Sequence, residues 1–182
     1  MKKALFFDRD GTLIVHQPYL HRADDVALIP GTIEALQRAR AAGYLLFLFT
    51  NQSGVGRGYF PLADVHRVHA RLLELVGAGP DLFAATCIAP EHPDAPSAYR
   101  KPSPRFIQEM TQRYDLAADE SWMIGDTASD WRAGRAAGIS TAAVRSKLFD
   151  AEAETIALGL AVPVYANLAA FAEACLEPAL AG

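Results

Sequence analysis

Two aspartates stand two residues apart directly after a short apolar run near the N-terminus. Asp8 and Asp10 follow Leu5-Phe6-Phe7 and precede Gly11. The apolar run is typical of a buried strand, and residues i and i+2 of an extended chain point to the same side. Neighbouring buried carboxylates are costly unless a cation neutralises them. The pair therefore predicts a cation site, unless both aspartates are simply turn residues after a strand.

Further polar side chains lie at the ends of other predicted elements. Thr50 and Asn51 follow the apolar run 44–49, and Asp126 and Asp130 follow the run 121–124. Lys101 precedes a helix predicted from about residue 104. In an open parallel sheet, ligands bind where the carboxyl ends of the strands meet. Carboxylates, a hydroxyl, amides and an ammonium together suit Mg²⁺ and a phosphoryl group, with Asp8 and Asp126 as the expected Mg²⁺ ligands. An aspartate can also serve as a nucleophile.

The elements that must position these groups alternate along the chain. We expect strands over 5–7, 44–49, 83–88, 121–124, 139–144 and 162–165, and helices over 30–42, 62–76, 104–110, 131–137, 152–158 and 168–176. An irregular flap is expected over 12–29 and a loop over 50–58. The alternation predicts an α/β, Rossmann-like three-layer sandwich with a mainly parallel sheet and helices on both faces. We expect one domain, 1–182, without a separate cap domain.

The composition is that of an ordinary globular protein. Hydrophobic residues make up 51% and charged residues 21% of the 182 residues, and the formal net charge is -4. Without a basic surplus, the chain is not expected to bind nucleic acid or an anionic membrane. No apolar run reaches membrane-spanning length, and two cysteines are too few for a disulfide framework. We expect a cytoplasmic monomer that holds any anion with local groups.

Four ordered motifs resemble those of the haloacid dehalogenase-like phosphatases: Asp8-x-Asp10-Gly-Thr, Thr50-Asn51, Lys101, and Gly125-Asp126-x-x-x-Asp130. The resemblance implies that Asp8 is the nucleophile and forms an aspartyl-phosphate. It implies that Asp10 protonates the leaving alkoxide and then activates water. It also implies a Mg²⁺ ion held by the side chains of Asp8 and Asp126 and by the main-chain carbonyl of Asp10. Thr50 and Lys101 would bind phosphate, and Asp130 would orient Lys101 or a metal-bound water.

More particular stretches are similar to the capless branch that contains D-glycero-D-manno-heptose 1,7-bisphosphate 7-phosphatase and the histidinol-phosphate phosphatase domain: Asp8-Arg9-Asp10-Gly-Thr-Leu, 50–58 and Arg100-Lys101-Pro102-x-Pro104. In that branch the arginine before the motif lysine, here Arg100, contacts substrate. Asn51 and Arg57 are further candidates for substrate contact. The branch normally carries Cys-x-His and Cys-x-Cys zinc ligands in the preceding loop, where this chain has Ala-Pro-Glu-His at 89–92 and Ser-Ala-Tyr at 97–99. Because the thiolates are missing, we do not expect zinc.

The resemblance implies a Mg²⁺-dependent phosphomonoesterase that acts on a small phosphorylated metabolite. The expected substrate is D-glycero-D-manno-heptose 1,7-bisphosphate, cleaved at the 7-phosphate. One alternative is a histidinol-phosphate phosphatase or another sugar or polyol phosphatase. The former would need an acidic pocket for the substrate ammonium, for which Glu91 and Asp94 are candidates. Another alternative is a phosphate-binding module without turnover, which would not require an acid/base at Asp10.

Overall fold

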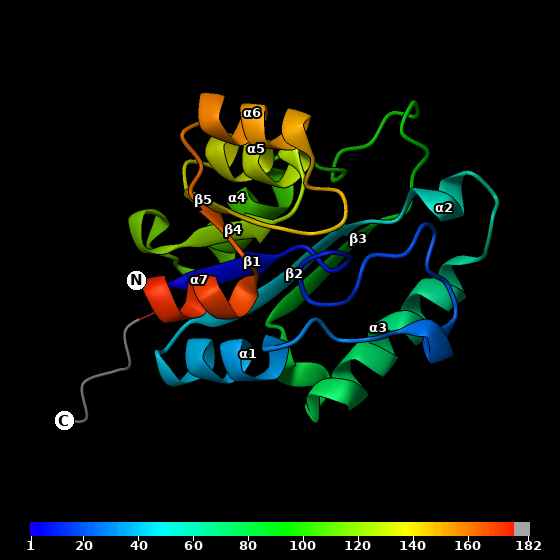
Figure 1. Ribbon diagram of the computed structural model, residues 1–182, viewed down its shortest axis with the longest axis horizontal. Helices are drawn as coiled ribbons and strands as arrows, with labels where there is room; N and C mark the ends of the chain where they lie inside the picture. The colour runs from blue at the N-terminus through cyan, green and yellow to red at the C-terminus, as the bar shows by residue number, and fades with distance from the viewer. Residues whose placement is uncertain (177–182) are drawn as a thin grey trace.

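In the part of the chain that the structure describes, a six-stranded parallel sheet forms the middle of the protein (Figure 1). The computed structural model describes residues 1–176; residues 177–182 of the predicted 1–182 domain lie outside the described part. The strands are β1 (Ala4–Phe7), β2 (Leu45–Asn51), β3 (Ala85–Ala89), β4 (Trp122–Gly125), β5 (Ser140–Val144) and β6 (Val164–Tyr165). Their spatial order is β3-β2-β1-β4-β5-β6, and every pairing is parallel. The strand that carries Asp8 is therefore central.

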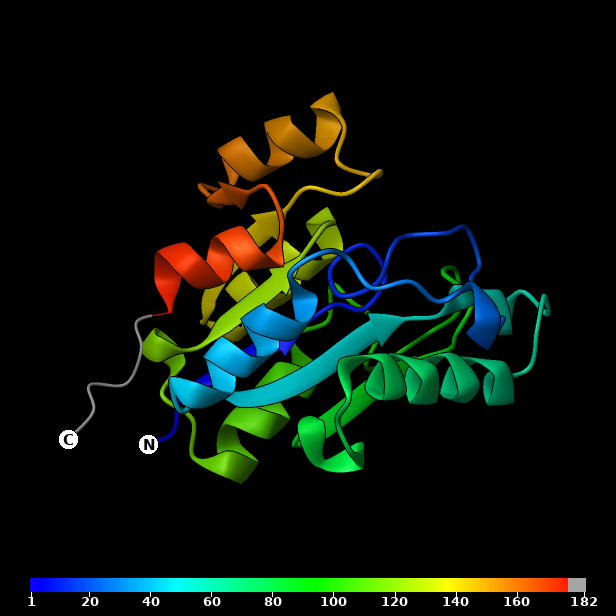
Figure 2. The same cartoon turned by 60° about the horizontal axis from the view of Figure 1, so that its bottom comes forward.

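Helices cover both faces of the sheet, which confirms the predicted three-layer architecture (Figures 1 and 2). One face is covered by α1 (Thr32–Ala41), α3 (Leu62–Val76) and α7 (Leu168–Cys175), and the other by α4 (Arg105–Tyr114), α5 (Ala128–Ala137) and α6 (Ala151–Gly159). Alternation along β1 explains this division: Leu5 and Phe7 join the first core, whereas Phe6 stacks on Phe47 of β2 in the second, with ring centroids 4.6 Å apart.

Some predicted boundaries were wrong. Residues 50–58 are not all loop, because Ser53–Gly56 forms a single helical turn, α2. Helix α5 begins at Ala128 rather than at 131, because Thr127 and Asp130 form a capping box that starts the helix earlier. The third strand begins at Ala85 rather than at 83, since Phe83 follows the short 3-10 helix Pro80–Leu82 and packs in the core.

The chain between β1 and α1 crosses the carboxyl edge of the sheet as a mostly irregular flap. Its only helical turn within the described chain is the 3-10 helix Ala23–Asp25. Isolated bridges join Asp10 to Ile14 and Ile14 to Leu28, so the flap is pinned close to the end of β1. A further 3-10 helix, Ala118–Glu120, precedes β4. Within residues 1–176, no helix combines the length and apolarity needed to cross a bilayer.

Candidate active site

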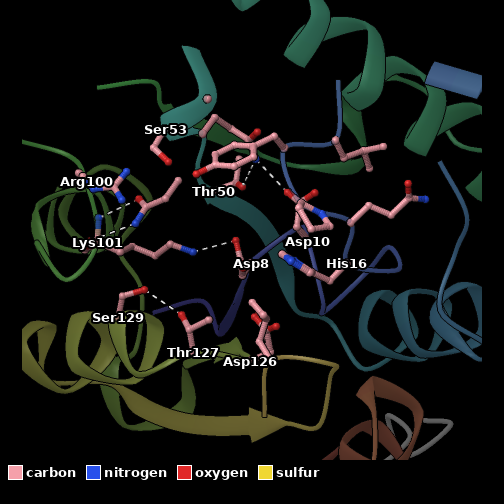
Figure 3. A pocket seen from close by; sticks show the side chains of 18 of the residues that line it. Asp8, Asp10, His16, Thr50, Ser53, Arg100, Lys101, Asp126, Thr127 and Ser129 are labelled. Carbon is pink, nitrogen blue, oxygen red and sulfur yellow. Dashed lines mark hydrogen bonds and ion pairs between the residues drawn. The ribbon is translucent and has the colours of Figure 1, made fainter. Parts of the chain in front are cut away.

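Lys101 joins two aspartates that come from different parts of the chain. Its Nζ lies 2.8 Å from Asp8 Oδ1 (Figure 3). It also lies 2.5 Å from Asp130 Oδ1, and all three residues are buried. Asp8 follows β1, and its N–H donates to the carbonyl of Ile124 in β4, 2.9 Å away. Asp130 lies in the first turn of α5, where its Oδ2 accepts from the main-chain N–H and the hydroxyl of Thr127. The lysine thus links the central strand to the start of a helix.

The pKa values of Asp8 and Lys101 are both raised, but for different reasons. Burial raises the pKa of Asp8 to about 6, although the neighbouring Lys101 ammonium acts to lower it. Burial alone would lower the pKa of Lys101, but the carboxylates of Asp130 and Asp8 raise it above the ordinary value for lysine. Lys101 is therefore a permanent cation beside the carboxylate that the sequence predicts to be the nucleophile.

Asp126 is a carboxylate with one occupied and one unpartnered oxygen. Its Oδ2 accepts from the hydroxyl of Ser146 at 2.6 Å, whereas its Oδ1 is buried and has no hydrogen-bond partner in the described part of the chain. Burial, followed by the charges of Asp8 and Asp130, raises the pKa of Asp126 to about 8. Oxygens of these three aspartates lie within 4.8 Å of one another. A Mg²⁺ ion fits this donor set, because it would neutralise the clustered charge and occupy the orphaned oxygen.

Gly11 allows Asp126 to approach the turn after β1. A Cβ atom at Gly11 would lie 2.1 Å from Asp126 Oδ2, and the residue has a φ of +88°, in the left-handed region. Any larger residue would displace the carboxylate or the turn. The glycine of the first motif is therefore required by a close approach as well as by its backbone conformation.

Asp10 stands outside the three-carboxylate cluster. Its Oδ2 accepts from the Nε of Arg9 at 3.0 Å and from the Nε2 of Gln52 at 2.9 Å. The same Gln52 amide lies 2.9 Å from the Thr50 hydroxyl, so the end of β2 is tied to the turn after β1. Asp10 nevertheless lines the same cavity as Asp8. The structure brings the predicted acid/base and the predicted nucleophile to one opening.

Asn51 holds the main chain of Lys101 rather than projecting freely into the cavity. Its Nδ2 donates to the Lys101 carbonyl at 3.1 Å, and its Oδ1 accepts from the Lys101 N–H at 3.0 Å. These reciprocal bonds span fifty residues of sequence. The amide therefore fixes where the lysine side chain starts.

A cavity of about 440 Å³ opens over these groups (Figure 3). The predicted residues that line it are Asp8, Asp10, Thr50, Asn51, Arg100, Lys101 and Asp126. Arg57 does not line it and is exposed, although its charge acts on Arg100. Arg100 Nη1 is buried and has no hydrogen-bond partner among residues 1–176. Tyr19, Leu20 and Phe60 add apolar side chains to the lining of the cavity.

Sequence reasoning missed several contributors. Ser146 follows β5 and supports Asp126, but a lone serine after a strand carries no distinguishing signal. Gln52 lies within the stretch 50–58 but was not predicted to have a role, and its position directly after Thr50-Asn51 was the available clue. His16 and Ser129 also line the cavity.

Comparison with known proteins places this geometry in a family. A D-glycero-beta-D-manno-heptose-1,7-bisphosphate 7-phosphatase of Pasteurella multocida is 38% identical over 146 residues, 76% of this chain and 79% of the relative. The chain belongs to the haloacid dehalogenase-like phosphatases. A family model described as HAD-hydrolase-like matches residues 98–170. A phosphatase of the same name from Pseudomonas putida is 32% identical, and the match covers 79% of this chain and 83% of the relative.

A solved structure supports the same assignment for this haloacid dehalogenase-like phosphatase. The D,D-heptose 1,7-bisphosphate phosphatase of B. bronchiseptica, complexed with magnesium and phosphate, superposes with a TM-score of 0.83 at 28% identity. The match covers 94% of this chain and 97% of the other. The protein is a phosphoric monoester hydrolase, as predicted, and the family and the fold class are confirmed.

The loop that carries zinc ligands in the capless branch is held by other contacts in this phosphatase. The Tyr99 hydroxyl lies 3.1 and 3.0 Å from the two carboxylate oxygens of Glu109, and Arg105 lies over the Tyr99 ring. Ser97 Oγ accepts from the Arg100 N–H at 3.0 Å. The contacts of Tyr99 with Glu109 and Arg105 anchor the residues before the lysine motif to α4, and the Ser97–Arg100 bond lies within the loop. That the protein contains no zinc stays a prediction.

Proposed function

We propose that this phosphatase hydrolyses the 7-phosphate of D-glycero-D-manno-heptose 1,7-bisphosphate with the help of Mg²⁺. The observation that carries the proposal is the buried contact of Lys101 with Asp8 and Asp130 beside the unpartnered Asp126 Oδ1. These are a nucleophile, a cation for the phosphoryl oxygens and a metal-binding carboxylate in a single cavity. The identity to two phosphatases of that name supports the substrate.

Mg²⁺ would be held by Asp8, Asp126 and the main-chain carbonyl of Asp10. Bound there, it would supply positive charge to the phosphoryl oxygens during transfer. Asp130 is not needed as a direct ligand, because Thr127 and Lys101 already engage its two oxygens. Its role in this proposal is to keep Lys101 aimed at the cavity.

The protein residues divide the reaction into two displacements. Asp8 attacks phosphorus, and the bond to the sugar oxygen breaks while Asp10 gives that oxygen a proton. Asp10, now a carboxylate, takes a proton from water as the water oxygen attacks the aspartyl-phosphate, which releases phosphate and restores Asp8. Lys101 and the Thr50 hydroxyl stabilise the phosphoryl oxygens in both steps.

Arg100 is the group that would favour a bisphosphate over a monophosphate. Its Nη1 is buried without a partner, and burial lowers the pKa of Arg100 although Glu91 acts to raise it. An uncompensated guanidinium donor at the cavity suits a second phosphate on the substrate. Neither Glu91 nor Asp94 is among the described residues that line the cavity, so they do not supply the acidic pocket that histidinol phosphate would need.

The test is phosphate release from heptose 1,7-bisphosphate, histidinol phosphate, hexose phosphates and glycerol phosphates, each with Mg²⁺ and with EDTA. We expect the heptose bisphosphate to have the highest kcat/KM, the 1-phosphate to remain on the sugar, and EDTA to abolish turnover. Flat activity across the panel would remove the substrate assignment. Unchanged rates in EDTA would remove the role of Mg²⁺.

Arg100→Gln tests the second phosphate directly. Loss of a charged hydrogen bond should raise KM for the bisphosphate by about tenfold or more, with little change for hexose monophosphates. Arg105→Gln is the matched control, because Arg105 is an exposed arginine of α4 that pairs with Glu109. Equal effects of Arg100→Gln on both substrate classes would contradict the assignment.

A further inference from the structure

Arg9 is the largest charged side chain that is entirely buried in the described part of the chain. Its exposed fraction is 0%. A buried guanidinium must be paired, since an uncompensated charge in the interior is strongly destabilising. Its one ion pair within residues 1–176 is with Asp10, from Nε to Oδ2 at 3.0 Å. Within the described chain, the charge of this buried arginine is therefore paired only with Asp10, the proposed general acid and base.

The Arg9 backbone and one further guanidinium nitrogen also make contacts. Its carbonyl accepts from the N–H groups of Thr12, Leu13 and Ile14 at 3.4, 3.0 and 3.1 Å, which closes the turn after β1. Its Nη1 lies 3.5 Å from the Val65 carbonyl of α3. Complete burial, the Nε contact with Asp10 and the Nη1 contact with Val65 limit how far the guanidinium can move, although its Nη2 has no hydrogen-bond partner within residues 1–176. The turn fixes the Arg9 backbone, so the side chain can orient Asp10.

The two oxygens of Asp10 have different surroundings. Oδ2 accepts two N–H groups, one from Arg9 and one from Gln52. Within the described chain, no hydrogen bond reaches Oδ1, and this oxygen does not belong to the buried atoms that lack a partner. A proton on Oδ2 would point at the N–H groups of Arg9 and Gln52, and neither nitrogen has a lone pair that could accept it. The carboxyl proton must therefore reside on Oδ1, the oxygen open to the cavity.

We propose that Arg9 is a positioning residue that keeps the transferable proton of Asp10 on Oδ1. The inference rests on the proposed function, because it assumes that Asp10 is the general acid and base. In the first step, the Oδ1–H bond breaks and the proton passes to the sugar oxygen as the P–O bond breaks. In the second step, Oδ1 takes the proton of the attacking water. Gln52 assists by occupying the same Oδ2.

The leaving group separates this role from a merely structural one. Glycerol 3-phosphate releases an alkoxide that needs a proton, whereas p-nitrophenyl phosphate releases a stabilised phenolate that does not. The quantity to compare is kcat/KM, because it includes steps only up to departure of the leaving group. Misplacing the proton should therefore reduce kcat/KM for the first substrate far more than for the second.

For Arg9→Met we expect kcat/KM for glycerol 3-phosphate to fall by about a hundredfold or more, the scale of general acid catalysis. For p-nitrophenyl phosphate we expect a fall of less than about tenfold, with a burst of p-nitrophenol because the water step is slowed. Arg9→Lys, which keeps the charge, should recover part of the loss. Arg71→Met, at an exposed arginine of α3 paired with Glu74, is the matched control.

Asp10→Asn distinguishes failure of this inference from failure of the proposed function. If Asp10→Asn lowers kcat/KM equally for both substrates, Asp10 is not the acid and the proposed function fails at that point. If Asp10→Asn is selective but Arg9→Met is not, only the inference is overturned. If Arg9→Met does not fold, Gln52→Leu is the variant to measure, because it removes one donor to Asp10 Oδ2 and leaves the Arg9–Asp10 ion pair. A smaller fall in the ratio of kcat/KM for glycerol 3-phosphate to that for p-nitrophenyl phosphate would support the inference. An unchanged ratio would overturn it.

Discussion

The side-chain amide of Asn51 binds both main-chain hydrogen-bonding groups of Lys101. The Nδ2 to carbonyl distance is 3.1 Å and the N–H to Oδ1 distance is 3.0 Å. The amide lies at the end of β2, and the lysine lies far along the chain, just before α4. A backbone-to-side-chain pair of this kind sets the position of the ammonium without touching it.

Asn51→Ala should therefore reduce kcat while leaving the lysine in the protein. Misplacement of a catalytic group by about 1 Å can cost on the order of a hundredfold in rate, and we expect a loss of that size. Asn167→Ala is the control: Asn167 caps α7 through its Oδ1, so its loss should lower stability by about 1 kcal/mol without lowering kcat. Steady-state kinetics and thermal unfolding of both variants check this. A wild-type kcat in Asn51→Ala would show that the pair is not needed.

Asp8→Asn should abolish turnover and preserve the fold. The amide cannot act as the nucleophile, whereas Lys101 keeps its contact with Asp130. We expect phosphate release to fall on the order of a thousandfold or more, with a melting temperature close to that of the unchanged protein. Asp24→Asn, in the 3-10 helix of the flap, is the control for an aspartate outside the cavity. Near-normal turnover in Asp8→Asn would refute the assignment of the nucleophile.

The metal-free protein should lose stability as the pH rises from about 5.5 to 8.5. Burial raises the pKa of Asp126 from 3.8 to about 8, so the folded state keeps a proton that the unfolded chain has already lost. Stability linked to this group is complete below the unfolded pKa and is lost as the pH rises through the folded pKa. Thermal unfolding in EDTA, with Asp126→Asn as reference, isolates this contribution. A pH dependence identical in both proteins would contradict it.

Mg²⁺ should stabilise the protein more at pH 8.5 than at pH 5.5. The ion and the proton compete for the same carboxylates, because metal ligands must be deprotonated. The measurement is the rise in melting temperature on adding Mg²⁺ at each pH. Asp126→Asn should remove most of that rise. An equal rise at both pH values, or a rise that survives in Asp126→Asn, would mean that the ion binds elsewhere.

Gly56→Ala should disturb the loop that precedes the lysine motif. A Cβ atom there would lie 2.2 Å from His92 N, 2.6 Å from Glu91 C and 2.8 Å from Pro90 O, and these backbone atoms cannot rotate away. We expect lower stability and a higher KM. Gly159→Ala is the control, because its Cβ would meet no atom within 4 Å and alanine favours helix by up to about 1 kcal/mol. Unfolding curves and KM values that match between the two variants would contradict the prediction.

The sequence predicted the order of elements and the edge where the site lies, because hydrophobic periodicity and strand-end polar residues are local signals. It did not predict that the Asp10 carboxylate lies apart from the cluster of Asp8, Asp126 and Asp130. If the strand continued, side-chain alternation would place Asp8 and Asp10 on one side and Arg9 on the other. In the structure β1 ends at Phe7, and the turn that follows brings Arg9 Nε within hydrogen-bond distance of Asp10. The separation of the Asp8 and Asp10 carboxylates depends on the geometry of that turn, which cannot be predicted from the spacing of the two residues in the sequence.

Contacts between distant segments were the other part that sequence could not supply. The hydroxyl of Ser146 on Asp126, and the amide of Asn51 on Lys101, depend on the folded sheet bringing the segments together. The early start of α5 had a local cause in the Thr127–Asp130 capping box, which the sequence contained and the prediction overlooked.

The strand order has a consequence for how the protein is made. The first half of the chain supplies Asp8, Asp10 and β1 to β3, while Lys101 and Asp126 arrive only with later residues. A nascent chain that has emerged as far as β3 therefore carries Asp8, the proposed nucleophile, without the Lys101 ammonium that compensates its charge. Competence to bind phosphate should arise at a late stage of translation, once β4 inserts beside β1 and completes the charge balance.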